Sequence, residues 1–98
     1  MNVQAFPTHL ADDDAVRRAL IECYAEISGI PRQAVADGYE GGIEFDSILG
    51  VELACAMEAR FGIVIPEERL TNPTLYKSLG GFSTVVHQSL VERTMARA

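Results

Sequence analysis

Apolar side chains recur at helical spacing in three segments of this chain, residues 12–28, 46–62 and 74–93. Such spacing brings the apolar positions of a helix to one face, which is then buried against a neighbouring element. The one run that resembles a strand, residues 63–65, has no second strand to pair with, so we expect an apolar link inserted into the core. The pattern predicts an all-α fold, a small four-helix bundle with three longer helices and one short third helix.

Turn-forming and capping residues set the expected ends of these helices. The sequence Gly-Ile-Pro should stop the first helix. Residues 29–46 hold five Gly and Pro residues without a sustained period, which predicts a long loop, and long loops inside compact domains are often functional. Asp46 is a strong N-cap candidate and places Ser47 at the first position of the second helix. The short third helix should cover residues 66–71, and the last helix should start between residues 74 and 78.

The length of 98 residues fits one domain, which we divide into a leader (1–11), a folded domain (12–93) and a tail (94–98). The formal net charge is −6, from 14 acidic and 8 basic residues. This balance disfavours nucleic acid and anionic membranes as partners, because both require clustered Lys and Arg. With no signal peptide or membrane-spanning run, we expect a cytoplasmic monomer in which Cys23 and Cys55 are reduced, buried core residues.

The residue types needed for catalysis do not come together in the sequence. The two histidines and two cysteines are scattered, without the close spacing of zinc ligands, so we expect no metal site. A P-loop, a G-x-G-x-x-G turn and a G-x-S-x-G elbow are all missing. Asp46 is adjacent to Ser47 and cannot readily orient a histidine on that serine, which disfavours a serine hydrolase. We therefore expect no catalytic residue and no enzyme activity.

On local sequence alone, Ser47 is an ordinary helix-start residue. The longer string FDSILGVELACAMEARFGIVIPEE, about a quarter of the chain, resembles the central part of the acyl carrier protein family. Members of that family have Asp-Ser-Leu, Val-Glu-Leu, Glu, Phe-Gly and Ile-Pro-Glu-Glu in this order. Here the motifs read Asp46-Ser47-Ile48, Val51-Glu52-Leu53, Glu58, Phe61-Gly62 and Ile65-Pro66-Glu67-Glu68. A weaker match in helix order and loop length extends over residues 12–92.

The resemblance implies that a phosphopantetheinyl transferase attaches 4′-phosphopantetheine from coenzyme A to Ser47, and that the thiol of this arm carries an acyl group as a thioester. An anionic phosphodiester on a first helical residue would lie at the positive end of the helix dipole, so the residue physics agrees. We expect Glu52 and Glu58 to point towards solvent. The same resemblance implies a surface that faces basic docking patches of acyl-loading, synthase and tailoring enzymes, made of Asp46, Ile48, Val51, Glu52, Cys55 and Glu58.

Three departures from the family pattern distinguish this chain from housekeeping fatty-acid carriers. Ile48 replaces the usual Leu, Ala59 stands where many carriers have an acidic residue and is followed by Arg60, and the chain is longer at both ends. These features are more similar to stand-alone carriers of polyketide or mixed polyketide–peptide biosynthesis. The alternatives are an aminoacyl or peptidyl carrier of nonribosomal peptide synthesis, an unmodified carrier-like module that binds a partner through its acidic helix, and a Ser47 hydrolase that a fluorophosphonate would label.

Overall fold

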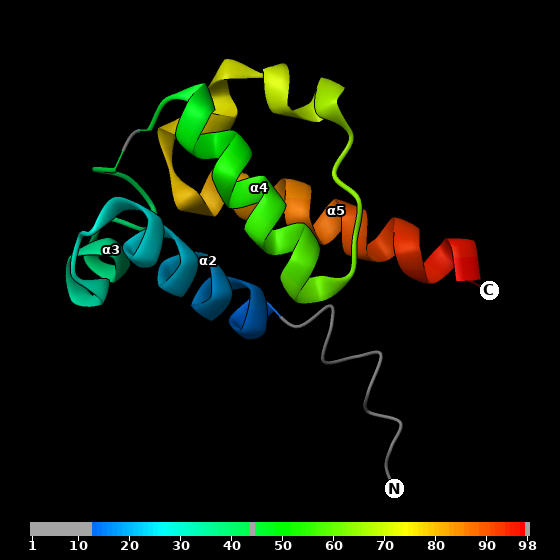
Figure 1. Ribbon diagram of the computed structural model, residues 1–98, viewed down its shortest axis with the longest axis horizontal. Helices are drawn as coiled ribbons and strands as arrows, with labels where there is room; N and C mark the ends of the chain where they lie inside the picture. The colour runs from blue at the N-terminus through cyan, green and yellow to red at the C-terminus, as the bar shows by residue number, and fades with distance from the viewer. Residues whose placement is uncertain (1–12, 44, 98) are drawn as a thin grey trace, which may run out of the picture.

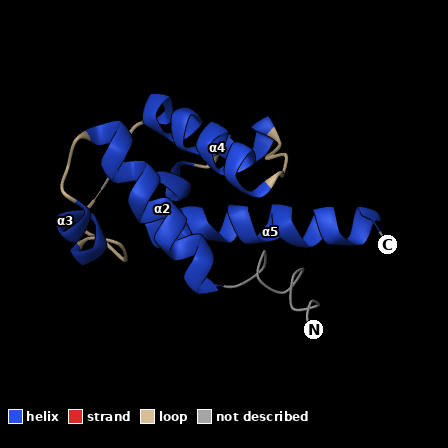
Figure 2. Ribbon diagram, turned by 60° about the horizontal axis from the view of Figure 1, so that its bottom comes forward, coloured by secondary structure: helices blue, strands red, loops and turns tan. Residues whose placement is uncertain are grey.

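A computed structural model describes residues 13–43 and 45–97 of the chain (Figure 1). Figure 2 shows helices and loops, and no strand occurs within these two ranges. The expected all-α bundle is therefore confirmed, while the expected leader, residues 1–11, lies outside the described residues. In chain order the helices are α2 (Asp13–Ser28), α3 (Arg32–Asp37), α4 (Ser47–Phe61), the 3-10 helices η2 (Glu67–Thr71) and η3 (Pro73–Lys77), and α5 (Leu79–Arg97).

Helix α2 connects the other helices of the bundle. It packs on both α4 and α5, and the short α3 packs back on α2. Figure 2 shows α2 crossing the long α5. The apolar stripe expected on α2 is buried, apart from a half-buried Ile27 at its end. The largest fully buried side chains of the core are Phe82, Leu20, Leu53, Met57, Leu79, Leu90, Val16, Val35 and Val86.

The loop expected between the first two long helices contains α3, which the sequence analysis did not identify. Pro31 precedes this helix as its N-cap residue, where its missing N–H is tolerated. Of the six residues of α3 only Val35 is buried, so the helix offers too few apolar positions for a period to be recognised. Further along this connection, the Tyr39 carbonyl accepts a hydrogen bond from the Gly80 N–H at 3.0 Å, which ties the connection to α5.

Helix α4 begins and ends at residues whose local chemistry explains its bounds. Asp46 is the N-cap residue and Ser47 the first helical residue, as the sequence predicts. The helix stops at Gly62, which adopts the left-handed conformation at φ 64° and donates its N–H to the Glu58 carbonyl. The side of α4 that faces the core consists of Gly50, Leu53, Ala54 and Met57.

The expectation that both cysteines are buried is wrong for Cys55. Cys23 is buried on α2, whereas Cys55 is exposed on α4, and both thiols are free. Helix α4 carries apolar residues on two sides, and Cys55 belongs to the side that no other described element covers. An apolar period identifies such a side, but it does not reveal whether a neighbouring helix packs against it.

The second half of the chain follows the expected order with small differences in the helix bounds. The short third helix is η2, and α5 begins at Leu79, after the additional turn η3. Helix α5 continues to Arg97, so it includes residues that the sequence analysis assigned to a tail. Ile63 and Ile65 are buried, which confirms the apolar link, while Val64 between them is exposed. None of the described helices is long and apolar enough to span a bilayer.

Candidate functional site

Ser47 lies exposed at the N-terminal end of α4. The Asp46 side chain accepts a hydrogen bond from the Leu49 N–H at 2.9 Å. The backbone carbonyl of Asp46 accepts a second one from the Gly50 N–H at 3.0 Å. These two bonds start the helix at Ser47. The first N–H groups of a helix lack intrahelical partners and carry the positive end of its dipole. The Ser47 hydroxyl therefore stands at an accessible position that favours a negative charge.

A cluster of aromatic rings anchors the chain immediately before this serine. The Phe45 ring meets those of Tyr24, Tyr76 and Phe82 at centroid distances of 5.5, 5.6 and 6.0 Å. The Phe45 N–H also donates to the Tyr76 carbonyl at 3.1 Å. Burial raises the pKa of the Tyr24 phenol, and the Asp46 carboxylate raises it further, so this phenol stays neutral. The serine is thus exposed at a helix start, two residues after a phenylalanine that packs against the core.

Gly50 allows η3 to approach the first turns of α4 closely. A Cβ at this position would overlap Cε1 of Tyr76 and lie 3.0 Å from Cδ1. The Tyr76 hydroxyl donates to the Leu70 carbonyl, so this ring links η3, η2 and α4. The sequence gives no sign of the role of Tyr76, because its partner Gly50 lies 26 positions earlier and a contact over that distance produces no local residue pattern.

Five of the six residues expected on the partner surface lie together on the exposed side of α4 and its N-cap. Ile48 is 73% exposed and Val51 is 48% exposed, so two apolar side chains lie close together on the solvent side of α4. Asp46, Glu52 and Cys55 are exposed beside them. Positions 51 and 52 each lie three or four residues from positions 48 and 55, so the four positions form one stripe along the helix. We call Asp46, Ile48, Val51, Glu52 and Cys55 the α4 stripe.

Glu58, the sixth expected residue, has a contact within the chain instead of pointing freely to solvent. It is half-buried, and its Oε2 accepts a hydrogen bond from the Ile65 N–H at 2.8 Å. The link after α4 turns back over the end of the helix, which brings that backbone donor to the carboxylate. Whether Glu58 also contacts a partner stays a prediction, whereas its hydrogen bond to the link is a structural feature of the bundle.

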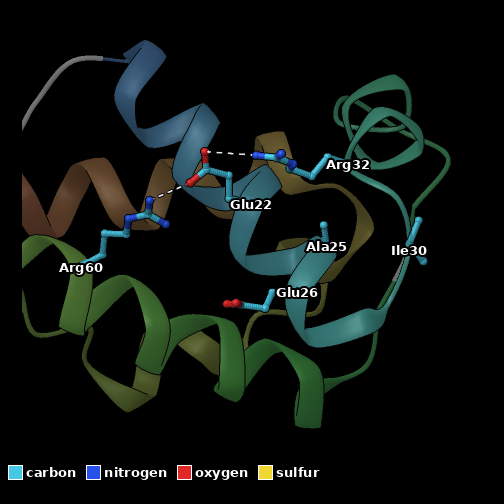
Figure 3. Close-up of a pocket in the computed structure, with 6 residues that line it drawn as sticks. All are labelled: Glu22, Ala25, Glu26, Ile30, Arg32 and Arg60. Atoms are coloured by element: carbon cyan, nitrogen blue, oxygen red, sulfur yellow. Dashed lines mark hydrogen bonds and ion pairs between the residues drawn. The ribbon is translucent and has the colours of Figure 1, made fainter.

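A hollow of about 570 Å³ lies between α2, α3 and the C-terminal end of α4, and Ser47 is not among its lining residues. Figure 3 shows the six residues that line it. Glu22 is central to it, with Oε1 2.7 Å from Nη2 of Arg60 and Oε2 3.7 Å from Nη1 of Arg32. The hydrogen bond from Arg60 lowers the pKa of the Glu22 carboxyl. Arg60 also donates to the Cys23 thiol at 3.4 Å. These contacts tie α4 to α2, and they pair Glu22 with both arginines of the hollow.

The serine end of α4 fits a phosphate-linked arm better than it fits a metal or a catalytic site. Ser47 is exposed, its helix dipole favours an anion, and the neighbouring Asp46 side chain is already bound to the Leu49 N–H. No group of three or more His, Cys, Asp or Glu side chains that could hold a metal ion occurs within residues 13–43 and 45–97.

Comparison with known proteins agrees with this geometry. The sequence model of one protein family, described as phosphopantetheine attachment site, matches residues 18–77, which is more than half of the chain. The matched segment includes Asp46, Ser47 and the whole of α4. No curated protein and no solved structure matches the chain. The chain therefore belongs to the family of phosphopantetheine attachment domains, carrier domains that hold a covalent 4′-phosphopantetheine group.

Proposed function

We propose that this protein is an acyl carrier whose 4′-phosphopantetheine is attached to Ser47. The observation that carries the proposal is the position of this serine, exposed as the first residue of α4 and within the segment that matches the family. The bound arm supplies a thiol that holds the cargo as a thioester. No catalytic residue of the chain is required for this role, because loading and chemistry belong to the partner enzymes.

The residues around Ser47 hold the attachment point in a fixed position while leaving it accessible. Asp46 caps the helix, and the Phe45 ring lies among Tyr24, Tyr76 and Phe82. A transferase therefore meets a preformed helix start and does not have to order a flexible loop, which reduces the entropic cost of binding. A phosphodiester on Ser47 would be stabilised by the dipole of α4 and its first N–H groups.

The α4 stripe supports a docking surface next to the attachment site. Its exposed apolar members, Ile48 and Val51, provide contact area, and the carboxylates of Asp46 and Glu52 complement a basic patch. Charges of this kind mainly accelerate and orient the encounter, and salt weakens their effect. We therefore propose the transferase and the acyl-loading and synthase enzymes as partners, each with a basic docking patch.

The cargo class we propose is an acyl group of polyketide or related biosynthesis. Support comes from the isoleucine at position 48 and from Ala59 and Arg60, which leave the acidic surface of α4 thinner than that of fatty-acid carriers. Arg60 is also engaged with Glu22, so it belongs to the packing of α4 on α2. The competing proposal is an aminoacyl or peptidyl carrier. The exact mass of the cargo on protein purified from its own producer distinguishes the two, since every aminoacyl or peptidyl cargo contains nitrogen and a simple acyl chain contains none.

Attachment is tested by mass spectrometry of the intact protein after incubation with a phosphopantetheinyl transferase and coenzyme A. The wild-type chain should gain the mass of one phosphopantetheine group, and Ser47→Ala should gain none. Ser28→Ala, at the end of α2, is the matched control and should be modified like the wild type. Modification of the Ser47→Ala protein, or no modification of the wild type by several unrelated transferases, would contradict the proposal.

The α4 stripe is tested separately by the rate of this modification. Glu52→Lys should slow it, and the difference from the wild type should shrink as salt is added, because screening weakens the lost attraction. If a partner instead binds equally well to the wild type and to Ser47→Ala but is lost with Glu52→Lys, and no arm is ever attached, the chain is an unmodified interaction module.

A further inference from the structure

A cysteine lies on α4 in the same row of the helix surface as the proposed attachment serine. Ser47, Val51 and Cys55 follow one another at intervals of four residues, which places them along one ridge of the helix. All three are exposed, and so is Ala59, the next position of the row. An uncharged, solvent-facing track therefore leads from the serine along α4, and the Cys55 thiol stands free on it.

The spacing along this row brings Cys55 within reach of a 4′-phosphopantetheine arm on Ser47. The two residues are eight positions apart in one helix, a rise of about 12 Å. Such an arm has about 14 bonds from the serine oxygen to its sulfur and spans about 17 Å at about 1.2 Å per bond. The arm therefore reaches Cys55 without being fully extended. Val51, halfway along the row and 48% exposed, offers an apolar surface beneath it.

The other cysteine is not available to the arm. Cys23 is 7% exposed on α2, and its sulfur accepts a hydrogen bond from Nη1 of Arg60 at 3.4 Å. Of the two cysteines in the chain only Cys55 is exposed. The thiol that an arm on Ser47 can meet within its own molecule is therefore that of Cys55.

We propose that Cys55 forms a reversible disulfide with the thiol of the arm, an inference that rests on the proposed attachment to Ser47. The oxidant is a small disulfide such as oxidised glutathione. In a first exchange Cys55 binds one glutathione and the other leaves. In a second exchange the Cys55 sulfur passes from glutathione to the arm thiolate, and the second glutathione leaves. The protons of the two protein thiols end on the two glutathione thiols, which are the reduced products.

The disulfide takes the carrier out of use until it is reduced. A sulfur that is bound to Cys55 cannot hold a thioester. The arm also covers the row from Ser47 to Cys55, and Val51 and Cys55 belong to the α4 stripe. Because both thiols belong to one molecule, their effective concentration is in the millimolar range expected for a short flexible linker. Closure within one chain is therefore favoured over pairing of two chains at micromolar protein concentration.

The test starts from the chain that carries the arm, prepared with a phosphopantetheinyl transferase and coenzyme A and checked by intact mass. In mixtures of reduced and oxidised glutathione this chain should lose the mass of two hydrogen atoms and stay monomeric. Alkylation after unfolding should then label Cys23 alone, whereas the reduced chain is labelled at Cys23, at Cys55 and on the arm. The glutathione titration should give an effective concentration in the millimolar range.

The intact masses separate this inference from the proposed function. A chain that never gains the arm overturns the proposed function and this inference with it. An arm-bearing chain that forms only mixed disulfides with glutathione, or only dimers, overturns this inference alone. Once fully modified, Cys55→Ser should form no internal disulfide, while Cys23→Ala should form it like the wild type. An internal disulfide that persists in Cys55→Ser would equally disprove the role of Cys55.

A cysteine moved to another exposed position tests whether the row on α4 matters. Met95→Cys in the Cys55→Ser chain is the matched control, since Met95 is 70% exposed near the C-terminal end of α5. Figure 1 shows this end of α5 far from the start of α4. The effective concentration should be at least about tenfold lower than with Cys55, because a linker that cannot span two sites does not join them. Equal values at the two positions would show that any exposed thiol suffices, and the inference would be wrong.

Discussion

Replacing Gly50 by Ala tests the packing that holds the serine end of α4. The new Cβ would overlap Cε1 of Tyr76 and lie 3.0 Å from its Cδ1. The ring cannot move away without loss, because its hydroxyl donates to the Leu70 carbonyl and its centroid lies 5.6 Å from that of Phe45. The substitution therefore has two opposing effects: alanine favours the helical backbone of α4, but its Cβ disrupts the contact between Gly50 and the Tyr76 ring.

Opposing terms set the expected change in the free energy of unfolding. Alanine in place of glycine inside a helix contributes about 1 kcal/mol of stability. Overpacking costs about 1–3 kcal/mol, and displacing the Tyr76 hydroxyl loses a hydrogen bond worth about 1 kcal/mol. Gly50→Ala should therefore be less stable than the wild type by about 1–3 kcal/mol. In a domain of this size each kcal/mol lowers Tm by roughly 4–8 °C.

Thermal and urea unfolding, followed by far-UV circular dichroism, measure this effect. Gly41→Ala is the control, since no atom of another residue lies within 4 Å of its added Cβ, and its stability should be close to that of the wild type. In a Tyr76→Ala background the overlap is gone, so Gly50→Ala should become stabilising by up to about 1 kcal/mol. The reasoning is refuted if Gly50→Ala is as stable as the wild type, or if it costs the same in both backgrounds.

Other predictions address the helix cap, the link after α4 and an ion pair. Asp46→Ala should lower stability by about 1 kcal/mol in urea unfolding because the Leu49 N–H loses its acceptor, while Asp46→Asn should cost less. Glu58→Ala should cost about 1–3 kcal/mol by leaving a half-buried backbone donor unsatisfied, and a near-neutral result would contradict the hydrogen bond. The hydrogen bond from Arg60 lowers the pKa of Glu22 from its ordinary value of 4.5. The ion pair therefore stabilises the folded state at neutral pH, and this stabilisation is lost as the pH falls below 4.5. The Tm difference between the wild type and Glu22→Gln should therefore vanish in acid, and a difference independent of pH would disprove the assignment.

The sequence by itself determined those features that depend on neighbouring residues. Helix α4 starts where it does because the Asp46 side chain accepts a hydrogen bond from the N–H of Leu49, three residues later. It ends at Gly62, because glycine adopts the left-handed backbone conformation at little cost. The position of Ser47 at the helix start follows in the same way. The all-α class follows from apolar residues at helical spacing, which identify helices irrespective of how those helices are arranged.

Only the tertiary structure decided which sides of these helices are covered and which distant residues meet. Cys55 and the buried Cys23 both occur in apolar helical patterns, and their different exposure depends on where α2 and α5 pack. A glycine at position 50 destabilises the helix in which it lies, and it is needed there because the Tyr76 ring of η3 packs directly against it. Local conformation depends on a few adjacent residues, whereas burial depends on contacts between segments far apart in the chain, and no local pattern records them.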